Sequence, residues 1–298
     1  YPIALDDYDM KGKWEAFLPF TSIVKIDITE IPHEKIPALV ERFKANNIKL
    51  VAEKIETYEE YNTFKEMGFD YFQGYFLAKP EIVKHRKLGP SSLTMMELLT
   101  LSSQAKLDFD EVNKIIERDP SLTYLLLRFI NNPMVNKRHK ITSLKHALTF
   151  MGEVEVKKFI SLLALANLSD GQPSELMQMA LVRAKFCELV FTELKDSDNP
   201  LKGFLTGLLS LLDAMMEQRI DDLVSKVPIS DDVKGALCGN PGMLRHCLTL
   251  AQFFERAEWA GIQQFAAKYN IKQSLLHSYY NEAIKWAKHI HQSALNEK

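Results

Sequence analysis

The chain has 298 residues, of which 46% are hydrophobic and 26% are charged. This composition is typical of globular domains and excludes a disordered, collagen-like or disulfide-stapled chain. Its 37 basic and 39 acidic side chains give a formal net charge of −2, so neither a general nucleic-acid binder nor an anionic-membrane binder is expected. With about 150 residues per domain, the length indicates two domains.

The cysteines and the first residues of the chain predict the cellular compartment in which the protein is located. Cys187, Cys238 and Cys247 have no paired spacing, which favours a reducing environment. No apolar run approaches the roughly 18 residues of a membrane span, and no basic leader precedes an apolar stretch at the start. We therefore expect a cytoplasmic protein without a membrane span. The chain begins at Tyr1 rather than at Met, and we expect it to be an N-terminally shortened form of a longer protein.

The first part of the chain alternates between β-branched runs and helical patterns. Extended segments are predicted near 3–7, 22–28, 48–55 and 70–80, and helices over 33–47 and 57–68. Thr57 is the predicted N-cap of the second helix, and Gly68 is its predicted stop. Strand and helix alternate with short connections, which favours parallel βα units.

The remainder of the chain has a different sequence pattern. Residues 85–92 are basic and then rich in Gly, Pro and Ser, so they are predicted to form a linker. From Leu93 onward the strand signal disappears and helical patterns follow one another, with Asp110 and Ser121 as expected N-caps. No fixed period recurs, so a helical solenoid is not favoured.

Polar side chains collect near the ends of the predicted strands. In parallel barrels the catalytic groups lie at the C-terminal ends of strands, and adjacent carboxylates suit hard divalent cations. A lysine beside a metal-bound water can polarise it. The alternative interpretation is a set of solvated loop charges that follow buried strands. The residues concerned are Asp6, Asp7, Lys25, Asp27, Glu53, Glu56 and Gln73.

Four strings carry a family resemblance. LDDYD, VKID, VAEKIET and GFDYFQGYFLAKP occur in this order and resemble the second half of the EAL domain, a family of cyclic di-GMP phosphodiesterases. The family pattern is DDFGTG, KID, AEGVET and an ending that contains QGY. The resemblance implies that residues 1–84 are the C-terminal part of a TIM-like (β/α) barrel. It also implies metal-assisted hydrolysis of one phosphodiester of cyclic di-GMP, with two Mg²⁺ or Mn²⁺ ions.

The same resemblance implies residue roles, although this sequence departs from the family pattern. The Glu-Ala-Leu stretch and the family's Asn and Glu ligands are absent, the loop glycines of DDFGTG are replaced, and Lys54 stands where AEGVET has glycine. We therefore expect a vestigial site and no hydrolysis by this chain, with Mg²⁺ or Mn²⁺ bound only where the site is complete. The implied roles are metal binding by Asp6, Asp7 and Glu53, catalysis by Lys25, Glu53 and Glu56, and cyclic di-GMP contact by Gln73.

The helical part, residues 93–298, resembles the HDOD family, an all-helical relative of HD hydrolases. The family pattern is DP-L-x-x-x-LL-x-x-x-N followed by I-x-S-x-x-x-A-x-x-x-x-G. Ser210 and Leu211 stand where HD enzymes carry their metal-binding His-Asp pair, so no metal is expected in this part. The resemblance implies a catalytically silent protein-interaction module. The matching residues are Asp119, Pro120, Leu122, Leu126, Leu127, Asn131, Ile141, Ser143, Ala147 and Gly152.

Together these features predict an α+β chain: a partial EAL barrel followed by an all-α HDOD domain, as in bacterial EAL–HDOD signalling proteins. The resemblance implies a regulator linked to cyclic di-GMP that contacts a protein partner and influences motility, attachment or biofilm formation. Direct nucleic-acid binding is not expected, and the exposed sheet edge of a half barrel suggests a homodimer. Two alternatives stay open: an active metal-dependent phosphodiesterase in the full-length parent, and a scaffold without nucleotide contact.

Overall fold

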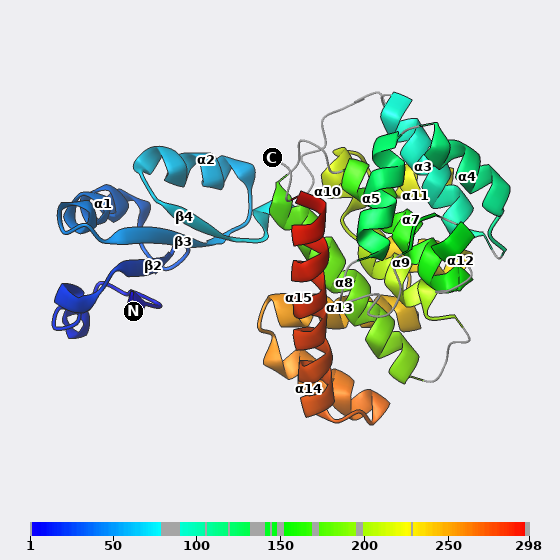
Figure 1. The fold of residues 1–298 in the computed structure, drawn as a ribbon. Helices are drawn as coiled ribbons and strands as arrows, with labels where there is room; N and C mark the ends of the chain where they lie inside the picture. Colours follow the sequence, from blue (N-terminus) through cyan, green and yellow to red (C-terminus); the bar gives the residue numbers. More distant parts are fainter. Residues whose placement is uncertain are drawn as a thin grey trace. The chain divides into compact units, whose positions relative to one another are not determined.

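The computed structural model divides the chain into two compact units, Tyr1–Glu81 and Ile82–Lys298, which are described separately. The first unit is α/β and the second is helical, which confirms the predicted α+β class (Figure 1). The first helix of the second unit begins at Pro90, three residues before the expected start at Leu93. The described residues are 2–78, 90–104, 106–118, 120–131, 141–143, 145–147, 152–168, 173–194, 199–227 and 229–295.

The first unit is built on a four-stranded sheet in the order β1-β2-β3-β4, and every neighbouring pair is parallel. The register places Leu5 beside Val24 and Asp27 beside Glu53. Parallel pairing brings the C-terminal ends of all four strands to one edge of the sheet. The strands are β1 (Ala4–Leu5), β2 (Ile23–Asp27), β3 (Lys49–Ile55) and β4 (Tyr71–Gly74).

Two helices supply apolar side chains to the core of this unit. Helix α1 (Ile36–Ala45) buries each of the positions that recur at helical spacing in its sequence. Helix α2 (Tyr58–Met67) begins at the predicted N-cap Thr57, whose side chain and that of Glu60 form a capping box, and it ends at Gly68 as predicted. Short 3-10 turns lie at Gly12–Trp14, Leu18–Phe20, His33–Lys35 and Tyr75–Ala78.

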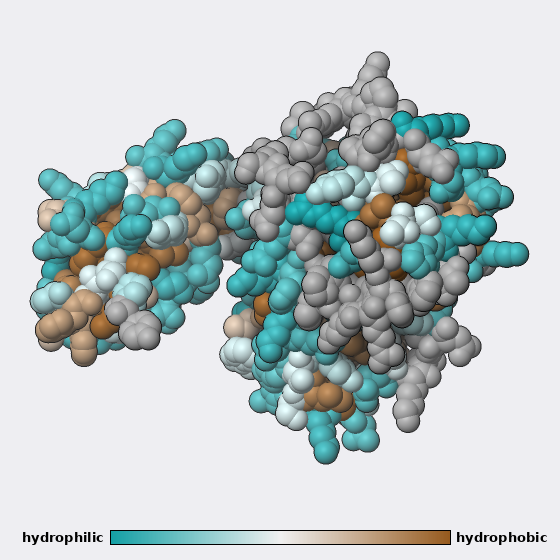
Figure 2. Space-filling model, in the orientation of Figure 1, coloured by the Kyte–Doolittle hydropathy of each residue, from teal (hydrophilic) through white to brown (hydrophobic). Residues whose placement is uncertain are grey.

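Exposed apolar side chains also occur in this unit. Ile3 adjoins the edge strand β1, and Phe17 and Phe20 lie in the segment that leads to β2, with Phe20 71% exposed. Figure 2 shows apolar surface on this unit. A partial barrel is expected to expose apolar surface and a strand edge in this way.

The second unit consists of packed helices. Asp108, rather than the expected Asp110, caps α4, because its side chain accepts a hydrogen bond from the Glu111 amide. Ser121 is not an N-cap either, since α5 begins at Pro120. The described helices are α3 (Pro90–Ser103), α4 (Phe109–Glu117), α5 (Pro120–Ile130), α7 (Glu153–Leu168), α8 (Ser174–Glu193), α9 (Leu201–Leu209), α10 (Leu212–Met216), α11 (Ile220–Lys226), α12 (Asp231–Leu237), α13 (Met243–Glu255), α14 (Trp259–Tyr269) and α15 (Gln273–Leu295).

Asn131, a polar residue of the HDOD pattern, links two segments of the helical unit by hydrogen bonds. Its side-chain amide donates to the carbonyls of Leu127 and Ile141, at 2.7 Å each, and its oxygen accepts from the Ile141 amide at 2.7 Å. Ser143 then accepts a hydrogen bond from the His146 amide at 3.1 Å. Asn131 thus joins the end of α5 to a distant segment. Asp119, the first residue of the pattern, lies outside the described residues.

Helix α8 is the centre of the second unit and packs against α9, α13 and α15. It meets α9 at two glycines four positions apart. A Cβ atom on Gly203 would lie 2.7 Å from the Cys187 carbonyl oxygen, and one on Gly207 would lie 2.2 Å from the Arg183 carbonyl oxygen. The two helix backbones approach closely because these positions carry no side chain. Among the described helices, none combines the length and apolar character needed to cross a bilayer.

Gly207→Ala is expected to lower the free energy of unfolding of the helical unit by about 1–3 kcal/mol, because the new methyl group collides with the α8 backbone. Gly12→Ala is the control, since a Cβ there meets no atom within 4 Å, and its effect should stay within about 0.5 kcal/mol. Urea unfolding followed by circular dichroism measures both. Equal midpoints for Gly207→Ala and the unsubstituted chain would contradict the close helix contact.

Candidate functional site

Three carboxylates meet at the C-terminal edge of the sheet. Asp6 and Asp7 follow β1, and Glu53 lies in β3. One oxygen from each lies within 4.8 Å of the others. Glu53 is buried, whereas Asp6 and Asp7 are exposed. The parallel register therefore brings together side chains that lie 46 to 47 positions apart in the sequence.

Lys25 lies on β2, between the strands that carry these carboxylates. Its Nζ is 2.7 Å from Asp6 Oδ1 and 2.5 Å from Glu53 Oε1. Burial by itself lowers the pKa of Lys25, but the hydrogen bonds to Asp6 and Glu53 outweigh it and raise this pKa overall. The side chain is therefore an ammonium ion that shares its single positive charge between two of the three carboxylates.

Asp27 is a buried carboxylate that was expected near a strand end but was given no role by the family resemblance. It ends β2, accepts hydrogen bonds from Thr29 N at 2.9 Å and Thr29 Oγ1 at 2.6 Å, and forms an ion pair with Lys54. Burial acts to raise the pKa of Asp27, but Lys54 and Thr29 lower it overall. Its place near the end of the second predicted strand, in the VKID string, is the signal that had pointed to it.

Lys54 has a left-handed backbone, with φ of 62°. It lies where the pairing of β3 with β4 shifts, between Ala52 and Ile55. The EAL pattern has glycine here, and glycine adopts such a φ at no steric cost. The chain thus keeps a backbone shape that favours glycine while adding an ammonium group beside Asp27.

Side-chain hydrogen bonds and ion pairs stabilise the loop after β1. Asp7 and Met10 both have positive φ, 50° and 61°. Asp9 accepts hydrogen bonds from Lys11 Nζ at 2.8 Å and Trp14 Nε1 at 2.6 Å, and Lys13 Nζ lies 3.2 Å from it. The hydrogen bond from Lys11 is the largest cause of the lowered pKa of Asp9. Asp9 thus stabilises a loop from which the glycines of the family pattern are missing.

Glu56 and Gln73 lie outside the carboxylate group. Glu56 follows β3, and its backbone amide donates to Glu60 Oε2 at 2.8 Å. It is not among the carboxylates that approach within 4.8 Å of one another. Gln73 is exposed on β4, on the opposite side of β3 from β1. The structure therefore brings Asp6, Asp7, Lys25 and Glu53 together and leaves these two further along the edge.

The three grouped carboxylates fit a hard divalent cation. Mg²⁺ prefers six oxygen ligands in octahedral geometry, so Asp6, Asp7 and Glu53 would supply part of the shell, with water or other ligands completing it. The Lys25 ammonium competes for two of these oxygens. A bound cation therefore requires a rearrangement of the lysine or of its partners.

In the helical unit, Ser210, which stands at the position of the HD pair, contacts a buried guanidinium. Arg183 on α8 is 2% exposed and binds Glu255 in a bidentate pair, with Nε–Oε1 and Nη2–Oε2 both 2.7 Å. Its Nη1 donates to Ser210 Oγ at 3.1 Å. Burial raises the pKa of Asp213, against which the charge of Arg183 acts. Among the described residues of this unit, no His, Cys, Asp or Glu group is close enough to hold a metal.

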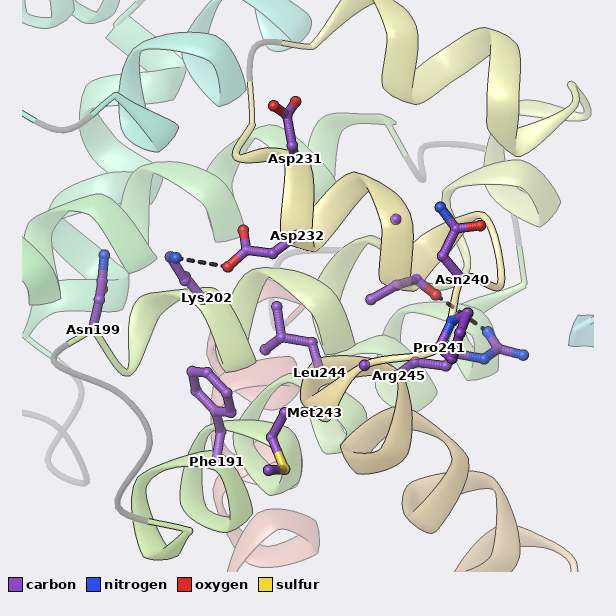
Figure 3. A pocket seen from close by; sticks show the side chains of 13 residues that line it. Phe191, Asn199, Lys202, Asp231, Asp232, Asn240, Pro241, Met243, Leu244 and Arg245 are labelled. Carbon is purple, nitrogen blue, oxygen red and sulfur yellow. Dashed lines mark hydrogen bonds and ion pairs between the residues drawn. The ribbon is translucent and has the colours of Figure 1, made fainter.

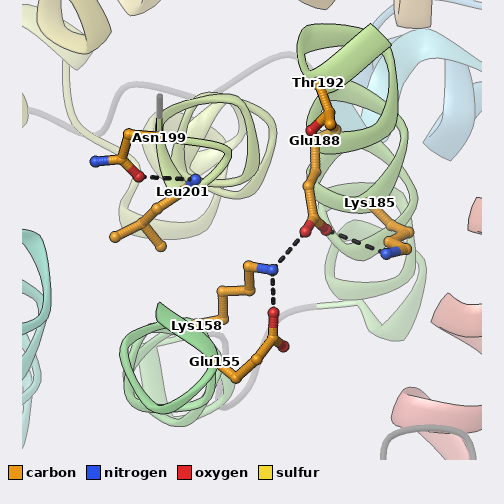
Figure 4. A network of polar contacts seen from close by, with 7 residues as sticks. All are labelled: Glu155, Lys158, Lys185, Glu188, Thr192, Asn199 and Leu201. Atoms are coloured by element: carbon orange, nitrogen blue, oxygen red, sulfur yellow. Dashed lines mark hydrogen bonds and ion pairs between the residues drawn. The ribbon is translucent and has the colours of Figure 1, made fainter. Parts of the chain in front are cut away.

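A second buried charge network joins α7 to α8 (Figure 4). Lys158 Nζ is 2.5 Å from Glu155 Oε1 and also pairs with Glu188, while Lys185 Nζ is 3.3 Å from Glu188 Oε2. Burial lowers the pKa of Lys158, but Glu188 and Glu155 raise it overall. The lysine is thus held as a cation that ties the two helices together.

The fold defines a partial (β/α) barrel domain with a carboxylate group at its edge, followed by an HD-like helical domain without described metal ligands. The EAL domain matches residues 18–80 and the HDOD domain matches residues 88–226. The chain belongs to the EAL–HDOD family. A relative that is 35% identical over 97% of this chain also shows this membership.

Two relatives span nearly the whole chain. The cyclic di-GMP phosphodiesterase CdgJ of Vibrio cholerae is 35% identical over 292 residues, which cover 97% of this chain and 68% of CdgJ. The uncharacterized protein YuxH of Bacillus subtilis is 29% identical over 294 residues, covering 96% of this chain and 71% of YuxH. A solved HDOD domain protein from Geobacter sulfurreducens has a TM-score of 0.38 and 15% identity, with 72% of each chain covered.

The stability contributed by the Asp27–Lys54 pair should depend on pH. Because Lys54 holds the pKa of Asp27 down in the folded chain, this contribution is complete above the unfolded value of about 3.9 and is lost as pH falls through the folded pKa. Lys54→Met should therefore lower the melting temperature at neutral pH, by an amount that shrinks in acid. Lys35→Met, at an exposed position, is the control and should follow the unsubstituted chain at every pH. A difference for Lys54→Met that is independent of pH would refute the assignment.

Arg183→Met should lower the free energy of unfolding by about 3–5 kcal/mol, because it leaves the Glu255 carboxylate buried without its partner. The double variant Arg183→Met/Glu255→Leu should be more stable than Arg183→Met alone, since no buried charge is left over. Arg256→Met breaks an exposed ion pair and should change stability by less than about 1 kcal/mol. Urea unfolding of the unsubstituted chain, Arg183→Met, Glu255→Leu and the double variant measures the coupling, and strictly additive effects would be inconsistent with the pair.

Proposed function

We propose that this chain is a signal-transduction regulator that binds cyclic di-GMP through its α/β unit and a protein partner through its helical unit. The observation that carries the proposal is the grouping of Asp6, Asp7 and Glu53 around Lys25 at one sheet edge. The relationship to CdgJ, a cyclic di-GMP phosphodiesterase, supports the choice of ligand.

Each polar residue at the C-terminal edge of the sheet would make a different contribution to ligand binding. A divalent ion such as Mg²⁺ or Mn²⁺ on Asp6, Asp7 and Glu53 would supply positive charge toward phosphate oxygens. Lys25, released from its carboxylate partners, offers a second cation to the same phosphate. Gln73 on β4 offers an amide that can donate and accept hydrogen bonds with the nucleotide. Glu56, next to α2, supports the loop that follows β3.

We further propose that the chain binds cyclic di-GMP without hydrolysing it. The loop after β1 lacks the glycines of the family pattern and is instead held by hydrogen bonds to Asp9. Lys54 adds a second cation at Asp27, where the family pattern has glycine. Both features favour a site that holds the nucleotide over one that turns it over.

Phosphodiesterase activity is the second candidate. The observation that favours it is that Asp6, Asp7, Lys25 and Glu53 all stand at positions that the family's catalytic pattern uses, and that they meet in space. A third candidate is a scaffold without nucleotide contact.

The helical unit is proposed to act by recognition. Ser210 and Leu211 stand where the HD enzymes have their metal-binding pair, and Ser210 accepts a hydrogen bond from Arg183, which favours a role in partner binding over a role in hydrolysis. The regulated output proposed for such a protein is motility, surface attachment or biofilm formation.

Calorimetric titration of the full chain with cyclic di-GMP, with and without Mg²⁺, tests the binding proposal. Binding is expected with Mg²⁺ present, and Asp6→Asn or Glu53→Gln should weaken it about tenfold or more, since each removes a carboxylate charge from the group. Glu59→Gln, an exposed acid on α2, is the control and should bind normally.

Chromatography of the titrated samples separates the candidates. Unchanged cyclic di-GMP after saturation supports the non-hydrolytic regulator. Linear product formation that disappears in Lys25→Ala supports the phosphodiesterase and overturns the proposal of silent binding. Absence of binding in both metal conditions overturns both nucleotide proposals and favours the scaffold.

A further inference from the structure

A cavity of about 220 Å³ lies in the helical unit, bordered by α7, α8, α9 and α15. It is smaller than the roughly 300–1,000 Å³ of typical small-molecule sites. Its volume therefore suits a single side chain rather than a nucleotide. Neither Arg183 nor Ser210 is among the residues that line it, so the cavity is separate from the position of the HD pair.

Helical spacing brings polar and aromatic side chains of three helices to this cavity. Residues three or four positions apart lie on one face of a helix, and each of the three helices contributes such a pair. The pairs are Glu155 and Lys158 on α7, Lys185 and Glu188 on α8, and Glu282 and Trp286 on α15.

The apolar wall of the cavity is fixed by the core. Phe204 of α9 is fully buried, and Trp286 contacts it edge to face, with ring centroids 6.1 Å apart. Trp286 is itself half-buried. Phe159 and Leu162 add apolar surface from α7. The indole ring is therefore held in one position while part of its surface stays accessible.

The charges at the cavity do not balance. The described residues that line it include three carboxylates and two ammonium groups. Lys158 and Lys185 are both engaged by Glu155 and Glu188 (Figure 4). Glu282 is exposed and forms no ion pair with the described residues. The cavity thus has one carboxylate in excess, one helical turn from Trp286.

A larger cavity of about 530 Å³ in the same unit differs in this respect (Figure 3). Lys202 and Asp232 form an ion pair of 2.6 Å at its side, so these two charges cancel. Asp231 and Arg245 are directed away from its apolar lining. Of these two cavities, the smaller one therefore combines an unmatched carboxylate with an accessible aromatic ring.

An arginine side chain suits this combination. Its guanidinium group is planar, stacks on aromatic rings and binds carboxylates through several N–H donors. Its three methylene groups pack on apolar surface while the charged end reaches a polar group. An anion would instead meet the carboxylate in excess, which is unfavourable.

We propose that this cavity binds an arginine side chain of the protein partner. The guanidinium group lies against Trp286 and Glu282, and the methylene groups lie against Phe159 and Leu162. This inference rests on the partner recognition proposed for the helical unit and names the chemistry that the partner presents. It is separate from cyclic di-GMP binding at the sheet edge.

Titration of the full chain with the blocked tripeptide acetyl-Gly-Arg-Gly-amide, followed through the indole N–H signals by NMR, tests this inference. Saturable binding is expected, with the largest change in the signal of Trp286, which is identified by its absence from Trp286→Leu. Replacing the arginine of the peptide by citrulline, which has the same shape without the charge, should weaken binding about tenfold or more.

Two substitutions in the cavity should weaken binding of the arginine peptide, each at least about threefold: Glu282→Gln and Trp286→Leu. The controls remove matching groups elsewhere. Asp231→Asn removes an exposed carboxylate at the larger cavity, and Trp259→Leu removes an indole that is 53% exposed on α14. Both controls should bind the peptide as the unsubstituted chain does, and thermal melting verifies that every variant is folded.

Three outcomes would each overturn the proposal: failure to saturate, equal affinity for the arginine and citrulline peptides, or unaltered binding by folded Glu282→Gln and Trp286→Leu. Because the peptide presents arginine alone, its failure to bind removes this site and leaves partner recognition by the rest of the helical unit standing. Cyclic di-GMP is titrated separately, so the function of the sheet edge is unaffected by either result.

Discussion

A charge taken out of water needs a partner, and this requirement shapes both units of the chain. An unpaired buried ion costs several kcal/mol, at least about 3 when a partner is removed from an existing pair. Lys25 is accordingly held by Asp6 and Glu53, and Arg183 by the two oxygens of Glu255. In each unit, the side chains at the position of family chemistry are first of all matched to one another.

At the sheet edge, these internal ion pairs compete with any ligand that binds there. The carboxylates that would hold a cation already share an ammonium ion, and Asp27 has Lys54. A metal ion or a phosphate group must therefore interact more favourably with these side chains than their internal ion-pair partners do. Electrostatic sites differ in this respect from apolar pockets, because the protein's own charges compete directly with those of the ligand.

In the helical unit, the same requirement is met inside the fold. Arg183, which is 2% exposed, binds both oxygens of Glu255 and donates to Ser210 at the position of the HD pair. Lys158 is held in the same way by Glu155 and Glu188. These matched charges suit a structural role.

The sequence by itself determined the class of each unit, the strand positions, the cap at Thr57 and the stop at Gly68, because periodicity and caps depend on neighbouring residues. Its ordered motifs also pointed to Asp6, Asp7, Lys25 and Glu53, which meet at the sheet edge, and to Glu56 and Gln73, which lie apart from them. Only the tertiary structure decided that Lys54 pairs with Asp27 and Arg183 with Ser210 and Glu255. Such pairs join side chains 27 to 72 positions apart, and packing and register, which no local pattern contains, bring them into contact.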